Sequence, residues 1–157
     1  MSRFYALIPA AGAGTRMGRE TPKQYLPLNS IPLIAHALIA LAREPRISKL
    51  FVVIAADDVW WDSYEWQGWG DRLQVLRCGG ATRAETVLNG LQAMAAECAA
   101  DDWVLVHDAA RPCLPAECLS QLLDEVADDA AGGLLAVPVA DTLKRAAADV
   151  ASGARVE

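Results

Sequence analysis

Short apolar runs recur along the chain, and most of them are separated by segments with helical spacing. The runs are residues 4–9, 50–56, 73–77, 103–107 and 134–139. Runs of this length that are apolar at successive positions are typical of strands buried on both faces of a sheet. Their alternation with helices predicts an α/β protein with a mostly parallel sheet flanked by helices.

Three segments have the apolar periodicity of helices. The first covers residues 32–43. A second begins near Ala84, because Thr82 and Glu85 have the spacing of a capping box. A third begins at residue 115, and its apolar stripe consists of Leu119, Leu122, Leu123 and Val126. Helices at these places lie between successive predicted strands.

The composition is that of one globular domain. The chain has 157 residues, of which 54% are hydrophobic and 22% charged, so it can bury a core without disulfides or a structural metal. With 14 basic and 20 acidic residues, the net charge is −6. This balance argues against a general binding surface for nucleic acid or anionic membranes, so any polyanionic ligand must be held locally.

The cysteines and the first residues favour a cytoplasmic protein with reduced thiols. Cys78, Cys98, Cys113 and Cys118 have no CxxC spacing, and we expect them to be buried small hydrophobic residues. Residues 1–12 have neither the pattern of a signal peptide nor that of a membrane span. We therefore expect no contact with a membrane.

The first predicted strand runs directly into a glycine- and alanine-rich loop, residues 10–18, which we call the glycine loop. Small residues let backbone N–H groups approach a phosphate closely. Arg16 and Lys23 would supply positive charge where a transferring phosphoryl group accumulates negative charge. The glycine spacing is GxGxxxG rather than GxGxxG, and GxxxxGK[ST] is absent. The loop is therefore neither a dinucleotide fingerprint nor a P-loop.

Two further loops carry charged residues at predicted strand ends. In VHDAARP, residues 106–112, Asp108 is placed to hold Mg²⁺ together with substrate phosphates, and Arg111 lies three residues on. In CGGATRAE, residues 78–85, Arg83 stands in the first turn of a helix, where a cation opposes the helix dipole. Such a position is explained more easily if this arginine meets an anion or the edge of a ligand than if it only supports the helix.

Taken in order, the segments IPAAGAGTRMG, PKQYL, CGGATRAET, VHDAARP and AVPVADTLKR resemble the bacterial 2-C-methyl-D-erythritol 4-phosphate cytidylyltransferases over nearly the whole chain. The resemblance implies a Rossmann-like fold of the nucleotide-diphospho-sugar transferase type. It also implies cytidylyl transfer from CTP to methylerythritol phosphate, which gives 4-diphosphocytidyl-2-C-methyl-D-erythritol and pyrophosphate in non-mevalonate isoprenoid biosynthesis. Mg²⁺ is the implied cofactor.

The resemblance also divides the chain and implies an assembly. Residues 1–138 correspond to the CTP-binding domain, and residues 139–157 to the start of a dimerisation and acceptor-binding arm. Relatives continue with further segments that grip the acceptor phosphate, so we expect the arm to be cut short here. A homodimer that exchanges this arm is the implied assembly.

The roles of individual residues follow from the same resemblance. Arg16 and Lys23 are the implied catalytic residues at the α-phosphate. The implied CTP-binding residues are Ala10, Ala11, Gly12, Gly14, Gly80, Arg83, Thr86, Asp108, Ala109 and Arg111. Asp108 is also the implied magnesium ligand, and Thr142 matches a residue that contacts methylerythritol phosphate. Ala81 replaces an acidic residue of some relatives, which leaves its share of base recognition open.

Alternative functions remain open at this point. A ribitol 5-phosphate cytidylyltransferase shares the glycine loop and the PKQ segment, although DAARP and PVADTLKR favour methylerythritol phosphate. A sugar-nucleotide pyrophosphorylase fits the PKQYL and DAARP pairing less well. From another class, the chain could be a CTP-binding fragment without turnover, because the acceptor-binding segments of relatives are absent from it.

Several notable side chains have a structural interpretation. We expect His36 and His107 to be packed or hydrogen-bonded residues rather than ligands. The aromatic cluster comprises Trp60, Trp61, Tyr64, Trp66 and Trp69. A short helix and loop packed over the sheet explains this cluster better than an exposed interface does.

Overall fold

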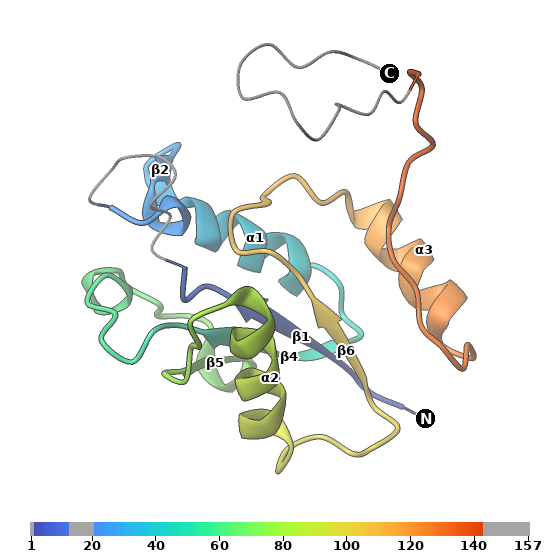
Figure 1. Ribbon diagram of the computed structural model, residues 1–157, viewed down its shortest axis with the longest axis horizontal. Helices are drawn as coiled ribbons and strands as arrows, with labels where there is room; N and C mark the ends of the chain where they lie inside the picture. The colour runs from blue at the N-terminus through green and yellow to red at the C-terminus, as the bar shows by residue number, and fades with distance from the viewer. Residues whose placement is uncertain (1, 13–20, 143–157) are drawn as a thin grey trace, which may run out of the picture.

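The computed structural model describes residues 2–12 and 21–142, which form a parallel sheet covered by helices on both faces (Figure 1). The sheet consists of β1 (Phe4–Pro9), β4 (Ile47–Val53), β5 (Leu73–Leu76) and β6 (Trp103–Val106). Its strand order is β5-β4-β1-β6, and every neighbouring pair is parallel. The prediction of an α/β fold with a parallel sheet is confirmed.

The two central strands are buried on both faces, which explains their nearly continuous apolar sequences. Successive side chains of a strand point to opposite faces. Ala6 and Ile8 of β1 therefore lie in the larger core, whereas Tyr5 and Leu7 lie in the smaller one. In β4, residues 50–53 are all fully buried. The side chains on both faces of the central strands are therefore buried, as is usual in a parallel sheet.

Three α-helices lie in the described ranges: α1 (Leu33–Ala42), α2 (Arg83–Met94) and α3 (Ala116–Val126). Side chains of α1 and α3 enter the larger core, and Met94 of α2 enters the smaller core. Accordingly, α2 lies on the face of the sheet opposite to α1 and α3 (Figure 1). Each helix begins within one residue of its predicted start. None of the helices in the described ranges is long and apolar enough to cross a membrane.

The connection from β1 to α1 contains a short 3-10 helix, η2 (Lys23–Tyr25), and a small hairpin. The hairpin pairs β2 (Pro27–Leu28) with β3 (Ile31–Pro32) in antiparallel fashion. The ring Nε2 of His36 bonds to the carbonyl of Leu28 at 2.8 Å, so the hairpin is tied to α1. This is the structural role expected of His36. Two more 3-10 helices, η3 (Trp61–Ser63) and η4 (Gly70–Arg72), connect β4 with β5.

The prediction of a strand at residues 134–139 is wrong. The segment forms no ladder, and β6 pairs only with β1 within the described residues. Its side chains are largely exposed: 79% for Leu134, 87% for Val137 and 63% for Val139. A strand needs a neighbour for its backbone N–H and C=O groups, and no described strand lies beside this run. Apolar sequence alone therefore did not produce a strand.

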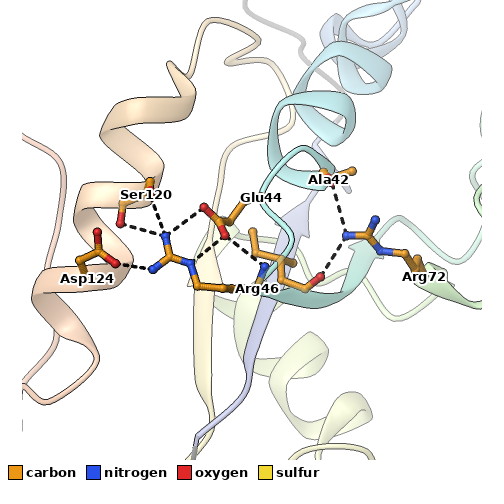
Figure 2. A network of polar contacts seen from close by, with 7 residues as sticks. Ala42, Glu44, Arg46, Arg72, Ser120 and Asp124 are labelled. Carbon is orange, nitrogen blue, oxygen red and sulfur yellow. Dashed lines mark hydrogen bonds and ion pairs between the residues drawn. The ribbon is translucent and has the colours of Figure 1, made fainter.

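A polar network joins the turn between α1 and β4 to helix α3 (Figure 2). Glu44, only 8% exposed, accepts from Arg46 at both carboxylate oxygens, at 2.7 and 3.0 Å. Arg46 also donates to the Ser120 hydroxyl at 2.8 Å and to Asp124. The hydrogen bonds of Arg46 hold the pKa of Glu44 below its usual range despite the opposing effect of burial. The network fixes α3, which follows the loop that carries Asp108.

The cysteines divide into two pairs by exposure, and all four are free thiols. Cys78 and Cys98 are partly buried, and burial raises the pKa of both thiols. Cys113 and Cys118 are exposed. The expectation of buried small hydrophobic residues is wrong for this second pair, because they lie before α3 and in its first turns, outside the apolar stripe.

Candidate functional site

Three loops meet at the carboxyl ends of the strands. They follow β1, β5 and β6, and we define them as residues 10–12, 77–82 and 107–115. Ala10 and Ala109 are both buried in the larger core, which brings the first and third loops together. The carboxyl edge of an open parallel sheet is where such folds bind ligands. The candidate site is therefore at the predicted edge.

Gly79 packs directly against the glycine loop. A Cβ at Gly79 would lie 2.3 Å from Cβ of Ala11 and 2.8 Å from the carbonyl oxygen of Ile54. The Gly79 N–H also donates to that carbonyl at 2.9 Å. Only a residue without a side chain fits there. Gly80 was a predicted CTP-binding residue and Gly79 was not, although the paired glycines are a visible signal in the sequence.

The capping box predicted at the start of α2 is present. The Glu85 N–H donates to the Thr82 hydroxyl, and the Thr82 N–H donates to the Glu85 carboxylate, both at 3.1 Å. Thr86 is buried, and its hydroxyl donates to the Thr82 carbonyl at 2.9 Å while it accepts from the Gly80 N–H at 3.1 Å. Thr86 therefore shapes the second loop, and its predicted contact with CTP stays a prediction.

Asp108 is held by two arginines. Arg83 donates from Nε to one carboxylate oxygen at 2.9 Å, and Arg111 forms an ion pair with the other, with its Nε 2.9 Å away. Partial burial favours the neutral acid, but the bonds and charges of the arginines outweigh it and hold the pKa of Asp108 below its usual range. The arginine side chains are 60% and 78% exposed. The cluster thus pairs an ionised carboxylate with two accessible cations.

The donor set suits a metal ion that is held mainly by its substrate. No group of three or more His, Cys, Asp or Glu side chains that could hold a metal occurs among residues 2–12 and 21–142. Mg²⁺ commonly binds through one or two carboxylates together with substrate phosphates and water. The single carboxylate of Asp108 fits that pattern once its arginines turn to another anion.

Lys23 stands exposed between the glycine loop and the aromatic cluster. It begins η2, in which the next two residues, Gln24 and Tyr25, are buried. The Gln24 amide donates to the carbonyls of Ala10 and Gly12. The Tyr25 hydroxyl donates to the Asp58 carboxylate at 2.9 Å. The position of Lys23 is therefore fixed by its neighbours on one side.

The aromatic cluster packs over the sheet, as expected. Trp61 is buried and stacks on Trp66 with ring centroids 4.1 Å apart. The rings of Tyr25 and Tyr64 stack with their centroids 5.9 Å apart. The carboxylate of Asp58 accepts from the backbone N–H groups of Trp60 and Trp61. Burial, followed by the bond to Asp58, raises the pKa of Tyr25. The cluster is a rigid support for η2.

Two cavities open at this edge of the sheet. The larger, of about 860 Å³, has Arg83, Asp108 and Arg111 at one end and runs between β6 and α3. Between β6 and α3, the walls of this cavity are mostly apolar. That part of the cavity suits an apolar chain segment better than a triphosphate. The smaller, of about 160 Å³, is lined by Ala11, Gly12, Pro22, Gln24, Ala55, Asp57, Asp58, Val59 and Trp60. Of the predicted site residues, Arg83, Asp108 and Arg111 line the larger cavity, and Ala11 and Gly12 line the smaller one.

Some of the predicted site residues lie outside the described residues, and the roles of others stay predictions. Gly14 and Arg16 lie outside the described residues, as do residues 143–157 of the expected arm. Thr142 is exposed and follows the extended segment after α3. Its acceptor contact and the domain division at residue 138 stay predictions. The expected structural role of His107 is present, because its Nε2 bonds to the carbonyl of Arg111 at 2.9 Å.

Comparisons with known proteins agree on the family. Residues 4–154 match the family described as IspD, 2-C-methyl-D-erythritol 4-phosphate cytidylyltransferase. A relative of that name from Thiobacillus denitrificans is 68% identical over 99% of this chain and 66% of its own length. Another, from Dechloromonas aromatica, is 59% identical over 98% of this chain and 68% of its own length.

Solved structures have the same fold. A crystal structure of 4-diphosphocytidyl-2C-methyl-D-erythritol synthase superposes with a TM-score of 0.81 at 38% identity, covering 99% of this chain and 68% of the other. The Francisella tularensis 2-C-methyl-D-erythritol 4-phosphate cytidylyltransferase superposes with a TM-score of 0.76 at 32% identity, covering 99% and 67%. The chain thus has the α/β fold of these nucleotidyltransferase structures.

The particular family follows from the same matches. The chain belongs to the 2-C-methyl-D-erythritol 4-phosphate cytidylyltransferase family. The family resemblance of the five sequence segments is thereby confirmed. The chain spans about two thirds of the length of the curated relatives it matches.

Proposed function

We propose that this protein transfers a cytidylyl group from CTP to 2-C-methyl-D-erythritol 4-phosphate and releases pyrophosphate. The observation that supports the proposal is that the loop after β1 packs against Gly79 and that Arg83 and Arg111 pair with Asp108, all at the carboxyl edge of the sheet. Family membership supports the same activity. The reaction would place the protein in non-mevalonate isoprenoid biosynthesis.

The chemistry requires charge neutralisation rather than a nucleophilic side chain. A phosphate oxygen of the acceptor attacks the α-phosphorus of CTP, a new P–O bond forms, and the bond to the bridging oxygen breaks so that pyrophosphate leaves. Two polyanions must approach each other, so positioned cations lower the barrier. Lys23 and Arg16 serve the α-phosphate in this proposal, Arg111 meets the polyphosphate, and Arg83 holds the cytosine and ribose side together with Gly80 and Thr86.

Asp108 would hold the metal in this proposal. A bound Mg²⁺ would draw charge from the triphosphate oxygens and orient them. Arg83 and Arg111 occupy both oxygens of the free carboxylate, so ligand binding requires an exchange of partners. The arginines turn to the nucleotide, and the Asp108 carboxylate becomes free for the metal ion. Their exposed side chains allow this movement.

The other expectations remain part of the proposal. Ala10, Ala11, Gly12 and Gly80 would line the CTP site, with Ala109 packed beneath it. The acceptor would be contacted by Thr142 and by the arm that begins at residue 139. A homodimer built through that arm and a cytoplasmic location complete the proposal, since the free thiols fit a reducing compartment.

Pyrophosphate release tests the proposed function. The protein is incubated with Mg²⁺ and CTP together with methylerythritol phosphate, ribitol 5-phosphate or no acceptor. Release with methylerythritol phosphate alone is the expected result. Preference for ribitol 5-phosphate would replace the proposed acceptor, and CTP binding without release from any acceptor would restrict this chain to nucleotide binding.

A further inference from the structure

We propose that Gln24 is a positioning residue that holds the start of the glycine loop in its phosphate-binding shape. The side chain is 6% exposed, and its amide nitrogen donates to the Ala10 carbonyl at 2.7 Å and to the Gly12 carbonyl at 3.1 Å. Both hydrogens of one NH₂ group are thus used on the same short stretch of backbone. The proposal rests on the proposed function only for the identity of the ligand.

The two bonds determine how the loop backbone is turned. In a trans peptide unit, the N–H points opposite to the C=O. Because the Ala10 carbonyl points at Gln24, the N–H of Ala11 points away from it. Free N–H groups that point outward from a turn are what an anion requires. Gln24 therefore orients donors for a phosphate without touching the phosphate.

Gln24 is itself anchored. It lies in the middle of η2, next to Tyr25, whose hydroxyl is bonded to Asp58 and whose ring stacks on Tyr64. The other neighbour is Lys23, which begins the same turn. One three-residue helix thus fixes the loop backbone and a cation relative to each other. A change at Gln24 should disturb both groups together.

The residue type follows from the two acceptors. A glutamine amide has two N–H donors on one nitrogen, whereas an ionised glutamate has none and an apolar side chain leaves both carbonyls unpaired. An unpaired buried carbonyl is costly, so the backbone would rotate to find another partner. The specific prediction is therefore that a side chain of similar volume without donors allows folding but releases the loop.

The first test uses Gln24→Met, which nearly conserves volume and removes both donors. Gln121→Met is the matched control, since Gln121 also donates through its amide, to Glu125, but on the exposed surface of α3. Calorimetric titration with Mg²⁺ and CTP should give about tenfold weaker binding for Gln24→Met. Hydrogen exchange without nucleotide should accelerate at Ala10, whose N–H donates to the Val53 carbonyl at 2.8 Å, and stay unchanged in β1. Wild-type affinity together with wild-type exchange would overturn the proposal.

A second variant separates positioning from simple filling of space. Gln24→Glu should bind CTP more weakly than Gln24→Met near pH 8 and recover affinity near pH 6, because only a protonated carboxyl can donate to one of the carbonyls. Lys23, Asp57 and Asp58 lie nearby, so each value is divided by that of the wild type at the same pH. A flat ratio would contradict the positioning role.

Hydrogen exchange and CTP titration test the role of Gln24 and the proposed function separately. Hydrogen exchange at Ala10 needs no ligand, so it decides whether Gln24 orders the start of the loop even if the wild-type chain binds no CTP. Absence of CTP binding by the wild type would count against the proposed function alone. Unchanged exchange in a folded Gln24→Met variant would count against the role of Gln24 alone.

Discussion

Arg83 and Asp108 are bonded across the carboxyl edge of the sheet, with Nε and Oδ1 2.9 Å apart. The bond joins the first turn of α2 to the loop after β6, and Arg111 holds the second carboxylate oxygen. A cation in the first turn of a helix opposes the helix dipole, so this carboxylate compensates for an unfavourable position. The carboxylate keeps two exposed cations side by side at this edge of the sheet.

Replacement of Asp108 by Asn should separate metal binding from nucleotide binding. The variant loses the carboxylate but frees two arginines, so CTP affinity without Mg²⁺ should rise. The gain in affinity on adding Mg²⁺ should disappear, and turnover should fall about 100-fold. Titration of CTP with and without Mg²⁺ measures both effects, with exposed Asp101→Asn as the control. A normal Mg²⁺ response in Asp108→Asn would assign the metal to another group.

Replacement of Lys23 by Ala should affect turnover far more than binding. A cation that matters only in the transition state contributes about 3 kcal/mol, which corresponds to a loss of roughly 100-fold in kcat. CTP affinity should change much less. Steady-state kinetics and titration give the two numbers, and Lys49→Ala, a lysine paired with Glu97 away from the site, is the control. Equal losses in kcat and affinity would exclude the transition-state role.

The sheet could be predicted because strands that are buried on both faces have apolar residues at successive positions, and this pattern is visible in the sequence. β1 and β4 are covered on both faces, so their residues had to be apolar at successive positions. The run at residues 134–139 has the same composition but no neighbouring strand in the described part of the chain. Strand formation depends on a partner as well as on composition, and a partner cannot be seen in a local pattern.

The site was predictable only where a residue follows a strand or begins a helix. Asp108 and Arg83 were found in that way, and the structure brings them together. Gln24 was not found, because a glutamine in a loop has no local feature that distinguishes it from a solvated polar residue. Its partners, Ala10 and Gly12, are more than ten positions away. Such long-range backbone contacts appear only once the chain is folded.

The Glu44–Arg46 network should make stability sensitive to acid. The pKa of Glu44 is lowered in the folded protein, so the unfolded chain binds the proton more readily, and stability falls as the pH drops below the ordinary glutamate range. Glu44→Gln should cost about 3 kcal/mol near pH 7 and should lack this part of the acid loss. Urea denaturation at several pH values tests the prediction.

An exposed glutamate provides the control for that experiment. Glu65→Gln changes charge by the same amount at an exposed position, so its free energy of unfolding should stay close to that of the wild type near pH 7. If Glu44→Gln lost stability on acidification as steeply as the wild type, the acid sensitivity would arise at other carboxylates.

Two glycine substitutions should separate loop packing from ligand approach. Gly79→Ala places a Cβ 2.3 Å from Ala11 and 2.8 Å from the Ile54 carbonyl, whereas a Cβ at Gly12 meets nothing within 4 Å. Gly79→Ala should therefore lose about 1–3 kcal/mol of stability and also bind CTP more weakly, since the glycine loop must shift. Gly12→Ala should keep the wild-type melting temperature and lose only affinity for CTP, because its methyl group keeps a phosphate from the backbone.

Thermal melts and CTP titration of both glycine variants distinguish these outcomes. Full CTP affinity in Gly12→Ala would mean that the phosphates do not approach the backbone at residue 12.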